Sequence, residues 1–282
     1  MSVTDVVDTD RYPLAHPGGD AWRAVVARTR RELAALGCSV LAGFIRPERF
    51  DQLRDEGARV APDAYYQVET VNVYNTDPDP AAPAEHPGHI TMERGNAFVP
   101  RDRIEPTAIV HQLYTDAAFQ RFVAECFELD HLHELADPLS GLVLNVIRPG
   151  RQHPWHFDTN EFTVSMLTQE PDDGGVFEYC PDIRTAQDEH FDDVRAVLEG
   201  RGERFIRQLV LRPGDLQLFK GRYALHRVST VHGDIARHTA IFAYSERPGV
   251  IGSPARTRQL FGRVLPEHLA AAGRVRVDQL LD

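Results

Sequence analysis

The sequence has no apolar run long enough to span a bilayer, and its acidic start, MSVTDVVDTD, is not that of a signal peptide. It has only three cysteines, widely spaced and without a C-x-x-C pair, which disfavours a disulfide framework or a structural zinc site. It also has no basic excess, because 31 Lys and Arg face 42 Asp and Glu, for a formal net charge of -11. That balance argues against a nucleic-acid partner. We therefore expect a cytoplasmic protein with reduced thiols and neither membrane nor nucleic acid as a partner.

The overall composition is that of an ordinary globular chain, with 42% hydrophobic and 26% charged residues. A chain of 282 residues can bury a substantial core, and no internal repeat or linker divides it. We expect a single domain over residues 1–282. Within it, a mostly helical region with a few strands covers 1–137, a strand-rich core covers 138–247, and a helical segment covers 248–282. The Pro-rich stretch 75–89 is expected to be a surface loop of unassigned role.

Apolar residues at helical spacing predict a helix from Trp22 to Leu36, which Gly37 is well placed to end. Further helical segments are expected over 47–60, 105–135 and 188–198, and early strands over 38–45 and 65–74. Short β-branched and aromatic runs separated by turn signals predict later strands within 142–150, 161–169, 174–180, 204–211, 214–221, 224–231 and 237–246. This pattern predicts a mainly β, α+β fold: an antiparallel barrel or jelly roll with helices packed outside.

The stretch WHFDTNEF places His156 and Asp158 two residues apart, so in an extended segment both side chains share one face. Alone, an H-x-D pair is a weak signal, because it occurs often by chance. A third metal ligand has to come from a later strand, where His226, His232 and His238 are candidates. His232 stands beside a turn signal and is expected to face solvent, which favours His226. Two histidines and one carboxylate are the ligand set of non-haem Fe(II) oxygenases.

Such a site leaves three coordination positions open, so a 2-oxo acid can chelate two of them and dioxygen can take the last. The distal carboxylate of 2-oxoglutarate then needs a buried cation, and the permanently charged fork of an arginine suits it. Arg237 stands eleven residues after His226 and is expected on the adjacent strand across a tight hairpin. Thr239 shares its strand face and can add a hydroxyl donor.

In order and spacing, His156, Asp158, His226, Arg237 and Thr239 resemble the signature of the Fe(II)/2-oxoglutarate-dependent oxygenases. The resemblance implies a double-stranded β-helix fold, the use of Fe(II), 2-oxoglutarate and O2, and the release of succinate and CO2. The stretches HPWHFDTNEFTVSMLTQEPDDGGVFEYCPDIR, LFKGRYALHRVSTVHG and LFGR are similar to bacterial oxygenases of free amino acids, a group that includes the lysine halogenases and their hydroxylating relatives. Those halogenases carry a small residue, usually Gly, where this chain has Asp158. The retained carboxylate therefore implies hydroxylation of an amino acid and not halogenation.

Four further residues are candidates for ligand contacts, each with a structural alternative. Asn145 could bond 2-oxoglutarate, or it could satisfy a barrel backbone. The resemblance gives His153 a role in holding the substrate carboxylate, whereas a loop histidine could instead bond nearby backbone. Arg94 could clamp the α-carboxylate or form a surface salt bridge. Asn160 could bind the substrate amine or simply be solvated at a strand end.

Two rival hypotheses remain open at this point. A non-catalytic, cupin-like metal-binding barrel would explain the strands and histidines, but it would not require Arg237 and Thr239. The same chemistry could instead act on a carrier-bound or protein-bound residue, or end in desaturation or ring closure. The sequence leaves the amino acid, the oxidised carbon and the oligomeric state open.

Overall fold

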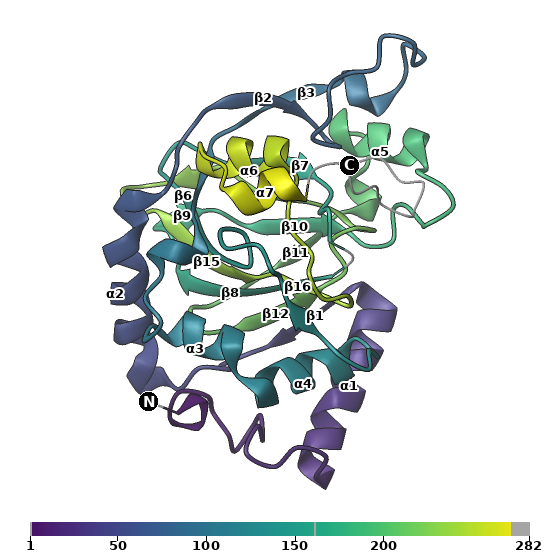
Figure 1. Cartoon of the computed structure of the whole chain (residues 1–282). Coiled ribbons are helices and arrows are strands. Elements are labelled where there is room, and N and C mark those ends of the chain that lie inside the picture. Colours follow the sequence, from purple (N-terminus) through teal and green to yellow (C-terminus); the bar gives the residue numbers. More distant parts are fainter. Residues whose placement is uncertain (1, 161, 272–282) are drawn as a thin grey trace.

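Two antiparallel sheets form the centre of the computed structural model, which describes residues 2–160 and 162–271 (Figure 1). The larger sheet has six strands in the order β1-β12-β8-β15-β6-β4. Its strands are β1 (Cys38–Leu41), β4 (Asn96–Val99), β6 (Leu142–Ile147), β8 (Thr163–Gln169), β12 (Leu216–Phe219) and β15 (Arg237–Phe242). The smaller sheet has the order β11-β10-β13-β7. Its strands are β7 (His153–His156), β10 (Phe177–Cys180), β11 (Arg207–Leu209) and β13 (Leu225–Val228).

Three short ribbons of two strands each complete the β structure. They pair β2 (Glu69–Asn72) with β3 (Thr91–Arg94), β5 (His133–Glu134) with β16 (Tyr244–Ser245), and β9 (Asp173–Gly174) with β14 (Val231–His232). The mixed α+β architecture with antiparallel sheets agrees with the prediction. The predicted closure into a barrel is not found, because no hydrogen-bonded pair of described strands joins the two main sheets.

Seven α-helices of the described chain surround the sheets (Figure 1). They are α1 (Asp20–Leu36), α2 (Phe50–Val60), α3 (Ile109–Thr115), α4 (Ala117–Cys126), α5 (Phe191–Leu198), α6 (Pro254–Phe261) and α7 (Pro266–Ala270). Single 3-10 turns add η1 (Val3–Asp5), η2 (Pro47–Arg49), η3 (Ala61–Asp63), η4 (Pro87–His89), η5 (Arg101–Arg103) and η6 (Glu203–Phe205). No described helix is both long and apolar enough to cross a membrane.

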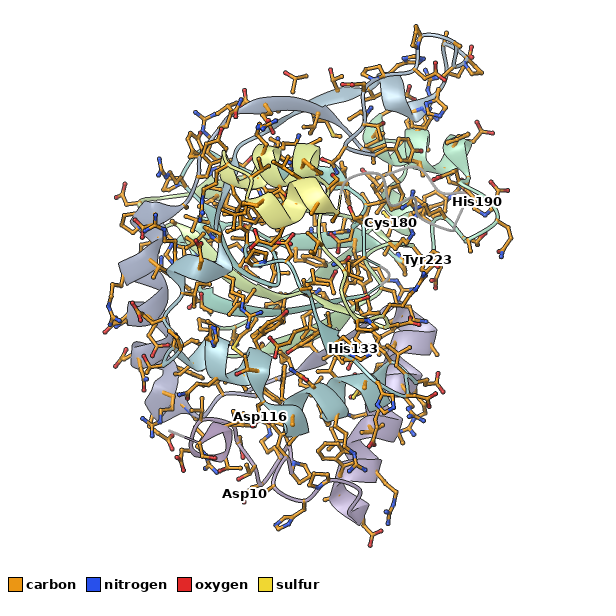
Figure 2. All side chains as sticks on the ribbon, in the orientation of Figure 1. Asp10, Asp116, His133, Cys180, His190 and Tyr223 are labelled. Carbon is orange, nitrogen blue, oxygen red and sulfur yellow. The ribbon has the colours of Figure 1, made fainter. Side chains whose placement is uncertain are left out.

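Helix α1 ends at Leu36 as predicted and begins two residues earlier than predicted, at Asp20. Gly37 adopts a left-handed φ of 67°, and its N–H donates to the carbonyl of Leu33, which ends the helix. The buried face packs on α4, where the Trp22 indole donates to Glu125 at 2.6 Å. Asp116 caps the start of helix α4, and its carboxylate accepts the Phe119 N–H at 2.8 Å (Figure 2). These caps fix the helical layer on one side of the six-stranded sheet.

The two faces of the six-stranded sheet have different roles. Along β15, Ala240 and Phe242 belong to the largest apolar cluster, which includes residues of helices α1 to α4. Because side chains alternate along a strand, Arg237 and Thr239 lie on the opposite face. His238 shares the helix-facing side, and its Nδ1 would lie 3.6 Å from a Cβ placed on Gly57 of α2. His238 is therefore excluded as the third metal ligand.

Arg237 does not lie on the strand next to that of His226, where the sequence led us to expect it. His226 lies on β13, which pairs with β10 and β7, whereas Arg237 lies on β15, which pairs with β6 and β8. Between them, β14 pairs with β9, so the chain passes from one sheet to the other. The two residues are therefore not neighbours across a hairpin.

Other segments differ from prediction mainly in length. The expected helices of 105–135 end at Cys126, and the expected strand of 65–74 is regular only in β2. The 75–89 loop packs against α5, with the rings of His86 and Phe191 4.4 Å apart between centroids. The expected C-terminal helices are α6 and α7, while residues 272–282 lie outside the described residues. All three cysteines are buried and free.

Candidate metal centre

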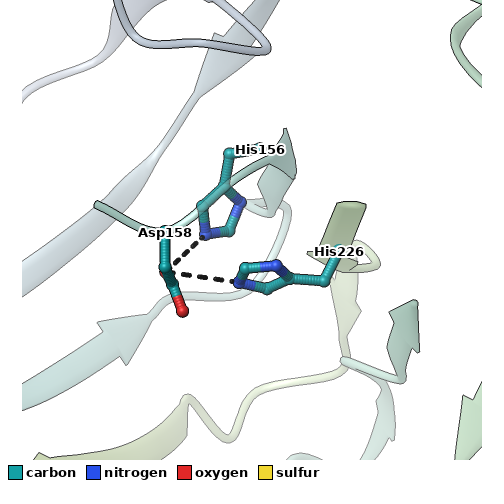
Figure 3. A group of neighbouring side chains, drawn as sticks. All are labelled: His156, Asp158 and His226. Carbon is teal, nitrogen blue, oxygen red and sulfur yellow. Dashed lines mark ion pairs between the residues drawn. The ribbon is translucent and has the colours of Figure 1, made fainter. Parts of the chain in front are cut away.

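His156, Asp158 and His226 converge in space (Figure 3). Oδ1 of Asp158 lies 3.4 Å from Nε2 of His226 and 3.8 Å from Nε2 of His156. One ligand atom from each residue lies within 4.8 Å of the other two. Within the described ranges, no other group of histidine, cysteine and acidic side chains meets this condition. Three donors at these separations could bind one face of a single metal ion.

Strand pairing brings the two histidines together. His156 of β7 and His226 of β13 are direct partners in the antiparallel register, so their side chains share one face of the sheet. The ring centroids lie 4.1 Å apart. Asp158 follows two residues beyond His156, and its N–H donates to the carbonyl of Gly221 at 3.1 Å. The carboxylate is thus anchored through the backbone beside the loop before β13.

The protein fixes which imidazole nitrogen faces the centre. Nδ1 of His156 lies 2.8 Å from the carbonyl oxygen of Pro154, and Nδ1 of His226 lies 2.9 Å from that of Ala224. A carbonyl oxygen only accepts, so each Nδ1 atom carries a proton, which leaves Nε2 as the ligand atom of a neutral ring. Burial, together with His153 and His226, lowers the pKa of His156 well below its usual range. His156 is therefore neutral and ready to bind a metal.

Asp158 is held with one oxygen toward the histidines. Its Oδ2 accepts a hydrogen bond from the Thr163 hydroxyl at 2.6 Å, which leaves Oδ1 facing the centre. Burial alone would raise the pKa of this carboxyl, but the interactions with His226, His156 and Thr163 outweigh it and hold the pKa well below the ordinary range. The side chain is therefore an anionic ligand at neutral pH.

Gly221 leaves the space that this carboxylate fills. A Cβ at position 221 would lie 2.0 Å from Oδ2 and 2.7 Å from Cγ of Asp158. No larger residue fits there while Asp158 keeps its position. Neither Gly221 nor Thr163 was identified from the sequence, where the first reads as a turn residue and the second as one strand residue among several.

A second polar region lies on the inner face of the six-stranded sheet. Arg237 is buried, its Nη1 donates to the Thr239 hydroxyl at 2.5 Å, and it forms no ion pair with any described residue. Burial lowers its pKa to about 10, so the guanidinium remains charged at neutral pH. Asn145 is the register partner of Thr239, and its Nδ2 is buried with no hydrogen-bond partner. Asn96, missed from the sequence, lies in the same sheet with both amide atoms buried and unpartnered.

A buried cation without a counter-ion is costly, and so are buried amides without partners. The residues of this face therefore fit an anionic ligand better than a closed core. This arrangement suits the distal carboxylate of a small diacid, with the guanidinium as its charged donor and hydroxyl and amide groups as further donors.

His153 connects the metal centre to a third group of residues. Its ring stacks on His156 with centroids 3.7 Å apart, and it meets Phe98 edge-on at 6.4 Å. Burial, followed by the charge of Arg94, lowers the pKa of His153 well below its usual range. His153 is half-buried, and its imidazole is neutral at neutral pH.

Arg94 is buried, so it is not part of a surface salt bridge. Its Nη2 donates to the carboxylate of Glu69, its register partner across β2 and β3. Nε and Nη1 are buried without a partner. Two donors of a charged group thus remain available to a ligand. Asn160 is half-buried, and no hydrogen bond among the described residues ties it to the centre.

Two further buried arginines support the segment that carries Asp158. The guanidinium of Arg184 lies 3.7 Å from the ring centroid of Phe157, and its Nε donates to the carbonyl of Arg222 at 2.7 Å. Nη1 of Arg222 donates to the carbonyl of Thr159 at 3.2 Å. The ligand segment is therefore fixed on both sides of Asp158.

Several solved structures have a similar fold. An oxidoreductase of the 2OG-Fe(II) oxygenase family from Burkholderia pseudomallei is 15% identical, covering 83% of this chain and 94% of that chain at a TM-score of 0.51. The Trichoplax adhaerens prolyl hydroxylase in complex with a hypoxia-inducible-factor peptide fragment is 12% identical, covering 80% and 90% at 0.53. The epimerase SnoN with Fe3+, α-ketoglutarate and nogalamycin RO is 12% identical, covering 79% and 84% at 0.52. These likenesses show that the chain has the fold of the Fe(II)/2-oxoglutarate oxygenases.

The family follows from the sequence itself. A family model described as Halogenase D matches residues 23–251, which is most of the chain, and the chain belongs to this family. No curated protein matches the sequence.

Proposed function

We propose that this protein is an Fe(II)- and 2-oxoglutarate-dependent dioxygenase that hydroxylates an unactivated C–H bond of a small free amino acid. The observation that carries the proposal is the convergence of His156, Asp158 and His226, in which Nε2 of each histidine lies near Oδ1 of an ionised carboxylate. When bound, Fe(II) and 2-oxoglutarate supply the oxidising chemistry: O2 and 2-oxoglutarate yield CO2 and succinate, and one oxygen atom enters the substrate. The protein supplies the ligands and the placement.

Support for 2-oxoglutarate comes from the inner face of the six-stranded sheet. Arg237 is buried without a counter-ion and Thr239 stands beside it, which suits a distal carboxylate. Asn145 adds an unpartnered amide. A non-catalytic metal-binding protein would have no use for a charged group in this position, because the cost of burying it would go uncompensated.

Asp158 favours hydroxylation, although the family is named for halogenation. Its carboxylate fills the position that a small residue leaves open for chloride in the halogenases that the sequence resembles. Two further residues are built around that carboxylate, since Thr163 bonds Oδ2 and Gly221 leaves the necessary space. The chain is therefore adapted to three protein ligands.

A free amino acid is the substrate that the third group of residues supports. Arg94 has two buried donors without partners, and His153 stacks directly on a metal ligand. We propose that these two side chains hold the α-carboxylate next to the centre. A fixed carboxylate would orient the substrate C–H toward the metal.

The test begins without oxygen. Fe(II) and 2-oxoglutarate added to the protein should give a weak visible charge-transfer band that His226→Ala and Asp158→Ala abolish. With oxygen, amino acids should then be screened for succinate release in the presence of chloride, and the molecular mass of each product should be measured. We expect a mass gain of one oxygen atom.

Three results would contradict the proposal in different ways. Absence of the band would show that 2-oxoglutarate does not bind at the iron. A chlorinated product would show that Asp158 does not block chloride. A product that lacks two hydrogens would instead indicate desaturation or ring closure. As a comparison, Asp158→Gly should lose hydroxylation and form little chlorinated product.

A further inference from the structure

Arg256 of α6 is a second arginine beside the substrate region. The helix lies over β4, because Phe261 of α6 and Phe98 of β4 belong to one apolar cluster. Phe98 in turn meets the ring of His153. Arg256 is half-buried, and Figure 1 shows α6 next to the central sheets. The helix that follows the strand-rich core in sequence thus packs on the strand whose Phe98 meets His153.

Several charged groups act on Arg256. Burial lowers its pKa to about 10, and the like charge of Arg94 acts in the same direction. The negative charges of Asp158 and Glu69 raise the pKa of Arg256 and so oppose these two effects. His153 is subject to the charges of both Arg94 and Arg256. Both guanidinium groups are therefore near enough to His153, the residue that stacks on His156, for their charges to act on it.

The partners of the two arginines differ. Arg94 donates to Glu69 and keeps two buried donors without partners. Nη1 of Arg256 donates to the neutral amide of Gln259 at 2.5 Å. No ion pair joins Arg256 to a carboxylate within residues 2–160 and 162–271. Arg256 is thus a charged group near the centre without an anionic partner in the described chain.

The charges of these residues indicate which charged groups a substrate needs. A free amino acid has one carboxylate, for which Arg94 has free donors, and one ammonium group, for which Glu69 is the adjacent carboxylate. The positive charge of Arg256 is then still unmatched. An amino acid with a neutral side chain leaves that charge without a counter-ion, and a basic side chain adds repulsion to it.

We infer that Arg256 binds a second carboxylate, so that the substrate is an amino acid with an acidic side chain, of the aspartate or glutamate class. The inference rests on the proposed function, and it names the substrate class of that same site. Arg256 serves as the specificity-determining residue: it contacts the side-chain carboxylate, while Arg94 and His153 bind the α-carboxylate.

The test compares each acid with its amide, which has nearly the same shape. Anaerobic protein loaded with Fe(II) and 2-oxoglutarate is titrated with L-aspartate, L-asparagine, L-glutamate, L-glutamine and L-lysine, and the change in the visible band gives each dissociation constant. We expect one of the two acids to bind about 10- to 100-fold more tightly than its amide, the range of a hydrogen bond to a charged group. Succinate release should follow the same order.

Arg256→Gln should reduce the acid-to-amide ratio to within about threefold and leave the dissociation constant of 2-oxoglutarate unchanged. Arg258→Gln is the matched control, because Arg258 lies on the exposed side of the same helix, and it should keep the wild-type ratio. Comparable thermal unfolding of the two variants shows that the effect is not a loss of folding.

The outcomes separate the inference from the proposed function. If a neutral or basic amino acid binds as tightly as the acids and supports succinate release, the oxygenase function stands and the acidic substrate class is refuted. An undiminished acid-to-amide ratio in Arg256→Gln overturns the role of Arg256. A missing 2-oxoglutarate band in the wild-type protein overturns the proposed function itself.

Discussion

Replacement of Gly221 by alanine tests the metal centre without altering any proposed ligand. The new Cβ would lie 2.0 Å from Oδ2, 2.7 Å from Cγ and 2.9 Å from Cβ of Asp158. The Asp158 side chain is short, and its backbone N–H is bonded to the carbonyl of Gly221 itself. The carboxylate therefore has to rotate away from the two histidines, and it loses its hydrogen bond from Thr163 as it does so.

The size of the effect follows from what is lost. Removal of a group that orients a metal ligand typically costs about 10- to 100-fold in metal affinity, or about 1.4–2.8 kcal/mol. In Gly221→Ala the ligand is displaced as well as released from Thr163, so we expect a loss at the upper end of that range. The fold should remain, because the clash is confined to one carboxylate and the loop beside it.

An anaerobic Fe(II) titration, monitored through the 2-oxoglutarate charge-transfer band, measures the loss directly. The matched control is Gly57→Ala, the same substitution on helix α2. There the new Cβ meets only ordinary contacts, with His238 Nδ1 and Thr168 Oγ1 at 3.6 Å. Iron affinity should be unchanged, and alanine in a helix is favoured over glycine by about 0.5–1 kcal/mol. Wild-type iron affinity in Gly221→Ala would refute the assignment of Asp158 as a ligand.

Three other changes have defined outcomes. Thr163→Val removes the hydrogen bond to Asp158 and should weaken Fe(II) binding about tenfold in the same titration, with unchanged circular dichroism. Arg237→Gln should weaken 2-oxoglutarate binding by about 2–5 kcal/mol in an anaerobic titration while Fe(II) affinity is kept, and equal cosubstrate affinity would contradict its role. His268→Ala breaks a fully buried pair with Asp137 and should lower the free energy of unfolding by about 3–5 kcal/mol in a denaturant titration. Burial alone would raise the pKa of Asp137, but backbone N–H donors lower it below its ordinary value. The contribution of the ionised Asp137 to the stability of the fold is therefore present at neutral pH and should be lost as the pH falls through the acidic range.

Local periodicity carried much of the prediction of the fold. The apolar spacing of α1 and its terminal Gly37 are encoded in adjacent residues, and so is the alternation of the strands after Pro138. The same two-residue period put His156 and Asp158 on one side of an extended segment. Where a stop signal was missing, prediction ran too far: α4 ends at Cys126, and Glu128 takes a left-handed φ of 62°, which few residues other than glycine adopt.

Strand pairing was the part that the sequence could not supply. Eleven residues between His226 and Arg237 suit a hairpin as well as a passage between sheets, and only the pairing of β14 with β9 decides between them. Arg256 was missed for the same reason, since its distance from the metal centre depends on how α6 packs over β4. Nothing in the local pattern around Asn96 or Gly221 distinguishes them from ordinary strand and turn residues.

The separation of His226 and Arg237 onto different sheets has a consequence for the choice of cosubstrate. The keto-acid end of 2-oxoglutarate would be held by ligands from the four-stranded sheet, and its far end by the six-stranded sheet. The spacing between the two sheets then acts as a ruler for the number of methylene groups. Oxaloacetate, with one methylene group fewer, and 2-oxoadipate, with one more, should therefore both bind more weakly than 2-oxoglutarate.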